Sequence, residues 1–454
     1  MSTPTVLITG AGSGIGRAAA NRFAADGWRC VLIDRDADAL ARVHLELPST
    51  RGGADTRTPD GRERSHATRR IDLADAAQVA TLADIDGPID AIVNNAGMSD
   101  PSGLPLVEQD GARQAALAAL NLAAPAAVVT ALESRLAAGA RVVNVSSGAG
   151  LRAIPWRGYY SATKAGLIAQ SRALALARPD LVVTVLCPGF VRTELVDALI
   201  AAGRLDAGQA LEKTPLGRMA EPAEMAELLR FLASPDAEVI RGEAVSLCGG
   251  SSVYGGSRHC EAATLAPLPR DTRLAASVVG RPGGGSTGSS ALADLAADLA
   301  ASLTAGLDAD AGIGSDIAPA PGDTPAYPAV VDLGALCAAD SGGDAGTLPI
   351  VTAVHDAARR FAARHARSAS LTLLLPADDA PHAGAWQRGG ERAAARMLVS
   401  TLACELAPRA LRVNAIEVGT RIDATRLIPL LRYVAGARAQ YLTGQTLRAV
   451  DARG

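Results

Sequence analysis

Two residues of this sequence, Tyr160 and Lys164, combine side-chain types and a spacing that could move a proton. The surrounding stretch YYSATKAGL is typical of a helix, and side chains four residues apart lie on the same helix face. An ammonium group about 4 Å from a phenol favours phenolate by roughly 4 kcal/mol at an effective dielectric constant of about 20. The pair therefore predicts a proton donor and acceptor that works closer to neutral pH than a free tyrosine, whose pKa is about 10. Tyr159 lacks this spacing and is expected to pack on or near a substrate pocket.

A glycine-rich turn, TGAGSGIG from Thr9 to Gly16, follows the first strand-like run and opens a helix. Glycines allow the backbone to approach a pyrophosphate, whose charge then lies at the helix N-terminus. The next strand-like run ends at Asp34, where a carboxylate can accept hydrogen bonds from an adenosine ribose and repel a 2′-phosphate. These features predict NAD as the cofactor. The adjacent Arg35 keeps NADP as the alternative, because a guanidinium can hold that phosphate, and a capping role is the alternative for Asp34 itself.

The elements that must position these residues follow from the hydrophobic pattern of the first half. Alanine-rich helical stretches alternate with β-branched runs that read as buried strands: TVLIT, CVLID, AIVNNAG, RVVNVSS and VVTVLCPG. This alternation predicts an α/β fold with a doubly wound, Rossmann-type parallel sheet covered by helices on both faces. The polar segment 47–70 is expected to include a surface loop before a strand at RRIDL.

Five motifs together carry a family resemblance: TGAGSGIG, NNAG at 94–97, VSS before Gly148, YSATK, and CPG at 187–189. Their order and spacing resemble those of the short-chain dehydrogenase/reductase family, from Thr5 to about Gly250.

The resemblance implies a role for each matching residue. Tyr160 would be the general acid and base, and Lys164 would bind the nicotinamide ribose hydroxyls and lower the tyrosine pKa. Ser147, with Ser146 as the neighbouring alternative, would hydrogen-bond the substrate oxygen, and Asn121 would hold a water of the proton relay. Taken singly, Ser147 and Asn121 have the alternative of capping helices or carbonyl groups. The cofactor-binding positions that it implies are Gly10, Ser13, Gly14, Ile15, Gly16, Asp34, Asp72, Asn94, Ala96, Gly97, Tyr160, Lys164, Pro188, Gly189 and Thr193.

The second half repeats the alternation in weaker form after a linker expected at 253–273. STLACELAPRALRVNAIEVGTRI and YLTGQTLRAV match, in the same order, QSRALALARPDLVVTVLCPGFVR and VIRGEAVSLCGG of the first half. We therefore predict two tandem domains: a catalytic domain at 1–252 and a degenerate Rossmann-like copy at 274–454. Chance similarity between two alanine-rich domains is the alternative.

The second copy is expected to be noncatalytic. With a two-residue length difference, alignment places Arg388 at the tyrosine position, Arg392 at the lysine position, and Leu375 or Pro376 at the serine position. Arginine stays protonated at working pH, and leucine and proline have no hydroxyl group. The glycine-rich segment VVGRPGGGSTGSS contains Pro282 and lacks the Gly-Ile-Gly ending, so no dinucleotide binding is predicted there.

Composition limits the other classes of function. The 454 residues have a net charge of -3 and no dense run of Lys or Arg, which argues against nucleic acid or an anionic membrane as a partner. Six scattered cysteines without a C-x-x-C pair predict neither a metal site nor disulfides and fit a reducing cytoplasm. The N-terminus runs directly into a strand, which argues against a signal peptide. The uncharged run 115–132 is long enough for a membrane span, but it contains Asn121 and Pro125, so a buried helix is expected.

The sequence thus predicts a cytoplasmic, metal-free NAD(P)-dependent oxidoreductase that interconverts a secondary alcohol and a ketone. The substrate stays open between a 3-oxoacyl thioester and a sugar or small alcohol. A lid at 194–219, with an apolar helical stretch at 195–202, is expected to select it. Because members of the family commonly form tetramers, a homodimer that imitates a tetramer of four domains is expected. The alternative function is a dinucleotide-binding sensor or assembly protein without turnover.

Overall fold

The protein is described by a computed structural model that divides into two compact units. The described residues are 3–48, 65–99, 111–152, 158–201, 206–255, 263, 266–280, 291–308, 326–339, 349–377 and 385–450. Unit 1 comprises Met1–Asp206, Met219–Pro235 and Arg241–Leu247, and unit 2 comprises Ala207–Arg218, Asp236–Ile240 and Cys248–Gly454. Residues 207–247 therefore alternate between the two units, whereas the sequence predicts a single boundary near residue 252. That boundary stays a prediction.

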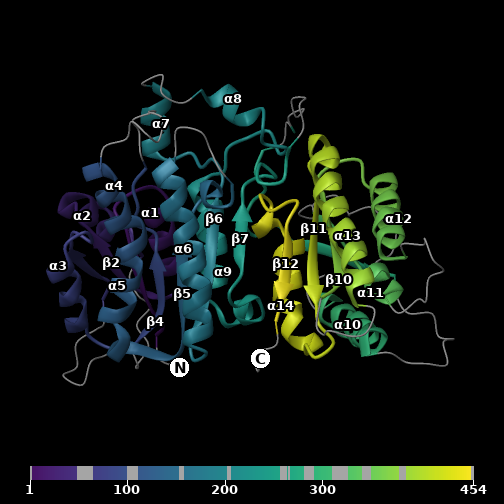
Figure 1. The fold of residues 1–454 in the computed structure, drawn as a ribbon, viewed down its shortest axis with the longest axis horizontal. Helices are drawn as coiled ribbons and strands as arrows, with labels where there is room; N and C mark the ends of the chain where they lie inside the picture. Colours follow the sequence, from purple (N-terminus) through teal and green to yellow (C-terminus); the bar gives the residue numbers. More distant parts are fainter. Residues whose placement is uncertain are drawn as a thin grey trace. The chain divides into compact units, whose positions relative to one another are not determined.

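Unit 1 is built on a seven-stranded sheet in the order β3-β2-β1-β4-β5-β6-β7 (Figure 1). All of its strand pairs are parallel. The strands are β1 (Thr5–Thr9), β2 (Arg29–Asp34), β3 (Ala67–Arg70), β4 (Ile89–Asn94), β5 (Leu136–Val145), β6 (Val182–Pro188) and β7 (Ala244–Leu247). The chain winds outward from β1 to β3 and then returns to β4 on the other side of β1. This order confirms the predicted doubly wound fold, whose binding crevice lies at the carboxyl ends of β1 and β4.

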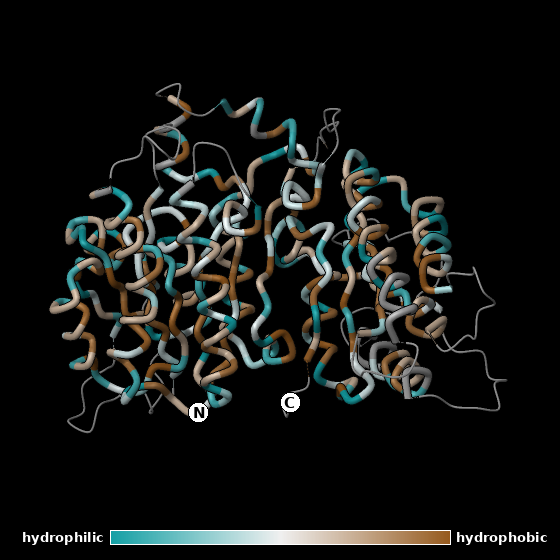
Figure 2. Tube along the Cα trace, in the orientation of Figure 1, coloured by the Kyte–Doolittle hydropathy of each residue, from teal (hydrophilic) through white to brown (hydrophobic). Residues whose placement is uncertain are grey.

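The helices of unit 1 form two groups. Helix α1 packs with α2 and α9, whereas α5 packs with α3, and α4 packs with α6. Their bounds are α1 (Gly14–Ala25), α2 (Ala37–Glu46), α3 (Ala76–Ala80), α4 (Gly111–Ala118), α5 (Ala124–Ala131), α6 (Gly158–Ala177), α7 (Glu194–Ala201) and α9 (Pro222–Leu232). The tube in Figure 2 alternates between hydrophilic and hydrophobic colours along these helices, as expected when one helix face covers a sheet.

The uncharged run predicted to be a buried helix forms α4, a π-helical turn at Ala119–Ala123 and α5. By length and composition, Ala112–Ala131 is the one described helix that could cross a membrane, and a third of its most apolar window is buried. Val128 and Val129 on α5 are buried in a hydrophobic cluster that also contains residues of β1, β4 and β5. A single helix of this kind is weak evidence for a membrane, since core helices of globular domains have the same composition.

Unit 2 contains a five-stranded parallel sheet in the order β12-β11-β10-β9-β8. The strands are β8 (Leu274–Val279), β9 (Tyr327–Asp332), β10 (Ala369–Pro376), β11 (Leu411–Val418) and β12 (Thr446–Ala449). The helices are α8 (Ala207–Leu211), α10 (Ala291–Asp308), α11 (Gly334–Ala338), α12 (Pro349–Arg364), α13 (Ala385–Leu406) and α14 (Ala424–Ala435). From β8 onward, the strand order equals that of β1-β4-β5-β6-β7 in unit 1. No strand is present between β8 and β9 among the residues that the structure describes, where unit 1 has β2 and β3.

The interior of unit 2 contains a charged residue, Arg412 on β11, with 1% of its surface exposed. Its guanidinium donates hydrogen bonds to five backbone carbonyl oxygens and to the Tyr327 hydroxyl. Three of the carbonyl groups, those of Val434, Ala435 and Gly436, lie at the end of α14, where carbonyl groups have no hydrogen-bond partner within the helix itself. Arg412 therefore joins the end of α14 to the sheet.

Candidate active site

A cavity of about 640 Å³ lies in unit 1 at the carboxyl ends of its central strands. All the predicted site residues line it except Gly16, Asn94 and Asn121. Tyr160 and Lys164 thus share one cavity with the glycine-rich turn, and Tyr159 is not among the lining residues. The location agrees with the crevice that the strand order predicts.

At the glycine-rich turn, neighbouring backbone segments pack so closely that side chains at the glycine positions would not fit. A Cβ atom on Gly16 would lie 2.0 Å from the carbonyl oxygen of Gly10. Gly16 thus packs directly against the turn and is not among the residues that line the cavity. Gly10 and Gly14 have φ angles of +64° and +51°, in the region that favours glycine. Helix α1 begins at Gly14, so its first N–H groups face the cavity at a helix N-terminus. This cradle fits a dinucleotide pyrophosphate.

Asn95, which the sequence analysis did not single out, braces this turn. Its Nδ2 donates to the carbonyl oxygens of Thr9 and Gly10, each at 3.1 Å. The Thr9 hydroxyl accepts from the backbone N–H groups of Asn95 and Ala96 at 3.0 and 3.1 Å. The predicted neighbour, Asn94, points into the interior instead. The NNAG motif, which contains both asparagines, was the only signal in the sequence that could have indicated Asn95.

Asp34, at the end of β2, contacts the same turn. Its Oδ2 accepts from the Gly12 N–H at 2.9 Å, and its Oδ1 accepts from the Asp36 N–H at 3.1 Å. Each carboxylate oxygen keeps a lone pair for a further donor such as a ribose hydroxyl. Arg35 and Arg42 also line this end of the cavity, so it offers both an anion and cations to an adenosine.

Lys164 lies in the interior with 4% of its surface exposed. Its Nζ donates to the Val145 carbonyl oxygen at 3.0 Å and lies 6.0 Å from the centroid of the Tyr160 ring. Burial lowers the pKa of Lys164 from 10.5 to about 8, and the Cys187 thiol group opposes this shift by favouring the charged form. The ammonium form therefore still predominates at pH 7, beside the tyrosine ring. Lys213 is the only other lysine of the chain.

The two serines after β5 have different partners. The Ser146 hydroxyl is buried and donates to the Lys164 carbonyl oxygen at 2.8 Å, which fixes the start of α6 against β5. The Ser147 Oγ accepts from the Ala149 N–H at 3.1 Å, and accepting leaves its hydrogen for donation to a ligand. The predicted preference for Ser147 therefore has a chemical basis.

Asn121 lies in the π-helical turn, which is a geometry common at functional sites. Its side chain is fully buried, and it binds both backbone groups of Met98 at 2.9 Å and the Thr163 hydroxyl at 3.2 Å. These contacts hold Met98 at the cavity wall and connect it with α6. The expected role of Asn121 in holding a water stays a prediction.

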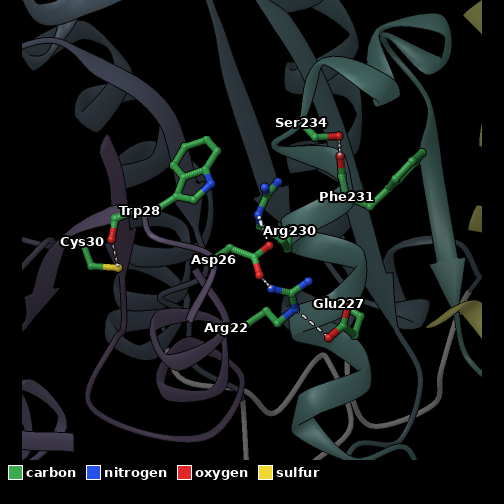
Figure 3. Close-up of polar contacts among 8 residues, drawn as sticks. All are labelled: Arg22, Asp26, Trp28, Cys30, Glu227, Arg230, Phe231 and Ser234. Carbon is green, nitrogen blue, oxygen red and sulfur yellow. Dashed lines mark hydrogen bonds and ion pairs between the residues drawn. The ribbon is translucent and has the colours of Figure 1, made fainter. Parts of the chain in front are cut away.

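An ion-pair cluster anchors the helix that begins at the glycine-rich turn. On α1, Arg22 pairs with Asp26 and also donates to Glu227 of α9 at 2.6 Å (Figure 3). Asp26 accepts from Arg230 of α9 at 3.0 Å, and the Arg230 guanidinium lies 5.0 Å from the Trp28 ring. Because Arg22 is buried, with 8% of its side chain exposed, this cluster restrains the position of α1 more than an exposed ion pair would.

Comparisons with known proteins match the first half of the chain. A family model described as enoyl-(acyl carrier protein) reductase matches residues 10–252. An uncharacterized short-chain type dehydrogenase/reductase of Sinorhizobium fredii is 35% identical over 247 residues, which are 54% of this chain and 43% of that protein. The chain thus spans less than half the length of this relative.

Two shorter relatives are matched over almost their full length. A putative ketoacyl reductase of Streptomyces coelicolor is 31% identical, over 55% of this chain and 97% of that protein. A meso-2,3-butanediol dehydrogenase of Serratia marcescens is 31% identical, over 55% of this chain and 95% of that protein. Among solved structures, a short-chain dehydrogenase/reductase of Brucella melitensis gives a TM-score of 0.48 at 28% identity, covering 56% of this chain and 98% of that one.

Proposed function

Because the chain belongs to the short-chain dehydrogenase/reductase family, we propose that it is a nicotinamide-dependent oxidoreductase that interconverts a secondary alcohol and a ketone. One observation carries this proposal: Tyr160, Lys164 and Ser147 line the same cavity as the glycine-rich turn. A protein that only sensed a dinucleotide would need the turn but not these three side chains.

The bound nicotinamide would supply the hydride acceptor or donor. Residues of the chain itself would bind the substrate oxygen and transfer its proton. The Ser147 hydroxyl donates a hydrogen bond to the substrate oxygen, and Tyr160 takes the hydroxyl proton in oxidation or returns it in reduction. The Lys164 ammonium, 6.0 Å from the centroid of the Tyr160 ring, would favour the phenolate form of Tyr160.

NAD is the proposed cofactor, with NADP as the alternative. The Asp34 carboxylate would accept from the ribose hydroxyls and repel a 2′-phosphate. Arg35 and Arg42 favour the opposite choice, because both line the adenosine end of the cavity. We place Asp34 first because its contact with Gly12 fixes its carboxylate beside the turn.

The substrate proposed is uncharged near its reacting carbon. Apolar side chains of Met98, Leu120, Val191 and Val196 contribute to the cavity wall. A 3-oxoacyl thioester would agree with the ketoacyl reductase relative, and a small diol would agree with the butanediol dehydrogenase relative.

We further propose that residues 274–454 are a noncatalytic second copy of the family fold. In unit 1, Val145 pairs with Leu186, which brings Ser147 level with Pro188. In unit 2, Pro376 pairs with Val418, which is followed by a glycine, as Pro188 is in unit 1. When these two glycines are aligned, Pro376 therefore takes the position of Ser147. Pro282 and the side chain of Arg388 lie outside the described residues.

The proposed assembly is a homodimer with four family-type domains. Light scattering at micromolar concentration is expected to give twice the chain mass. A monomer would rule this assembly out and leave the catalytic proposal untouched.

Replacement of Tyr160 by Phe tests the activity. Turnover is expected to fall by about 10²- to 10⁴-fold, because the general acid and base is removed, while NADH still binds. Tyr159→Phe is the matched control and should retain most of the turnover. If Tyr160→Phe binds NADH and the wild type shows no turnover with any alcohol or ketone in a broad screen, the sensor alternative is favoured.

A further inference from the structure

A glutamate at the start of α7 contacts the phosphate-binding turn of this chain. Glu194 Oε2 accepts a hydrogen bond from the backbone N–H of Gly14 at 3.1 Å, although 180 residues separate the two. Its other oxygen lies 3.7 Å from the Arg17 guanidinium of α1. The carboxylate is therefore held at the N-terminus of α1 by two groups that attract anions.

The neighbouring Thr193 brings the same segment close to the turn. A Cβ atom on Gly14 would lie 3.2 Å from Thr193 Cγ2, so the backbone at Gly14 and the start of α7 are in near contact. The Thr193 hydroxyl also accepts from the Val196 N–H at 3.3 Å, which fixes the first turn of α7. Glu194 thus extends from a fixed helix start rather than from a loose loop.

A carboxylate and a pyrophosphate are both anions that seek the same donors. The first N–H groups of a helix bind an anion well, and Gly14 is the first residue of α1. The Gly14 N–H that Glu194 now uses is one of the donors that a pyrophosphate at this turn would face, and the charge of the pyrophosphate would repel the carboxylate.

We propose that Glu194 is an internal competitor of the dinucleotide and sets its affinity. This inference rests on the proposed function, since it concerns the same cofactor site. Binding of the pyrophosphate moves the Glu194 side chain away from Gly14 and so breaks the link between the turn and α7.

The test is a fluorescence titration of Glu194→Gln and Glu194→Ala with NADH. Both variants are expected to bind NADH about fivefold more tightly than the wild type at low salt, because the competing charge is removed from an exposed site, where charge interactions are modest. The gain should shrink near 1 M salt, where the Debye length falls to about 3 Å. Asp197→Asn is the matched control: it removes one exposed carboxylate from the same helix and should leave the affinity unchanged.

The outcomes separate this inference from the proposed function. If the wild type binds NADH and both Glu194 variants bind it equally or more weakly, Glu194 is not a competitor. If Asp197→Asn tightens binding as much as Glu194→Gln, general charge rather than the Gly14 contact is responsible, and the inference also fails. If neither the wild type nor the variants bind NADH or NADPH, the proposed function itself fails.

Discussion

Asn144 on β5 donates a hydrogen bond from Nδ2 to the Ser171 hydroxyl on α6 at 2.8 Å, in the interior of unit 1. Asn144 also accepts from Nδ2 of Asn94 at 2.9 Å, so a polar chain crosses from β4 through β5 to α6. The helix that contains Ser171 carries Tyr160, and the strand that contains Asn144 ends just before Ser147. This chain therefore fixes the tyrosine relative to the serine.

Removal of the Ser171 hydroxyl should affect both stability and turnover. In Ser171→Ala, one buried donor of Asn144 loses its partner, so the free energy of unfolding should fall by about 1–3 kcal/mol in urea titrations. The kcat should fall more than the KM changes, because one of the contacts that fix α6 against β5 is lost. Ser171→Thr keeps the hydroxyl and should recover most of the kcat. A destabilised Ser171→Ala enzyme with wild-type kcat would show that the contact serves stability alone.

The pKa of Lys164 can be measured directly, because Lys164 and Lys213 are the only lysines of the chain. A protein labelled with ¹³C at lysine Cε should give two signals, and Lys164→Met assigns them. The Lys164 signal is expected to titrate near pH 8, since burial disfavours the charged form. A midpoint above 10 would contradict this burial effect.

The same shift predicts how Lys164 affects stability. Its folded-state pKa is below its unfolded value, so the cost of burying the charge is complete below pH 8 and disappears as the pH rises toward 10.5. Lys164→Met should therefore raise the free energy of unfolding at pH 7 by up to about 3 kcal/mol, although turnover is lost. The difference between the two proteins should vanish near pH 10.5. Lys213→Met, which changes an exposed residue, is the control.

Asp34→Ser should invert or weaken the cofactor preference. Without the carboxylate, a 2′-phosphate is no longer repelled, and Arg35 and Arg42 remain to bind it. The ratio of NADH to NADPH affinity in fluorescence titrations is expected to fall at least about tenfold, equivalent to roughly 1.4 kcal/mol. Asp38→Asn removes an exposed carboxylate from α2 and should leave the ratio unchanged. A wild type that already prefers NADPH would show that the arginines outweigh Asp34.

Arg412→Met should destabilise unit 2 by more than about 3 kcal/mol. The substitution removes one donor from each of five carbonyl groups, and the carbonyl oxygen of Leu442 keeps only its hydrogen bond from Asn414. Arg412→Lys keeps the charge but cannot supply the same fork of donors, so it should recover little. Arg421→Met, at an exposed position of the same unit, should stay within about 0.5 kcal/mol of the wild type. Thermal unfolding of the full chain provides the measurement.

The sequence predicted the buried strands of unit 1, because each is a short, nearly continuous apolar run such as TVLIT. The strand expected at RRIDL lies at Ala67–Arg70 instead. The sequence did not predict how the strands of unit 2 pair, since the pattern marks a strand without its neighbours. The pairing of Tyr160 with Lys164 could be predicted, because the two residues are about one helical turn apart. The roles of Asn95 and Glu194 could not, because they depend on contacts with residues that are distant along the chain.

The strand order of unit 2 has a consequence for heat stability. Its β8 lies at the edge of the described sheet, so the crevice that in unit 1 lies between outward-running and returning strands has no counterpart in that part of the chain. By mass action, a dinucleotide at 100 times its Kd adds about 2.7 kcal/mol to the unit that binds it. Saturation with cofactor should thus raise the melting of unit 1 first. If unit 2 binds no ligand at its own sheet, as we propose, its melting temperature should stay unchanged in the same experiment.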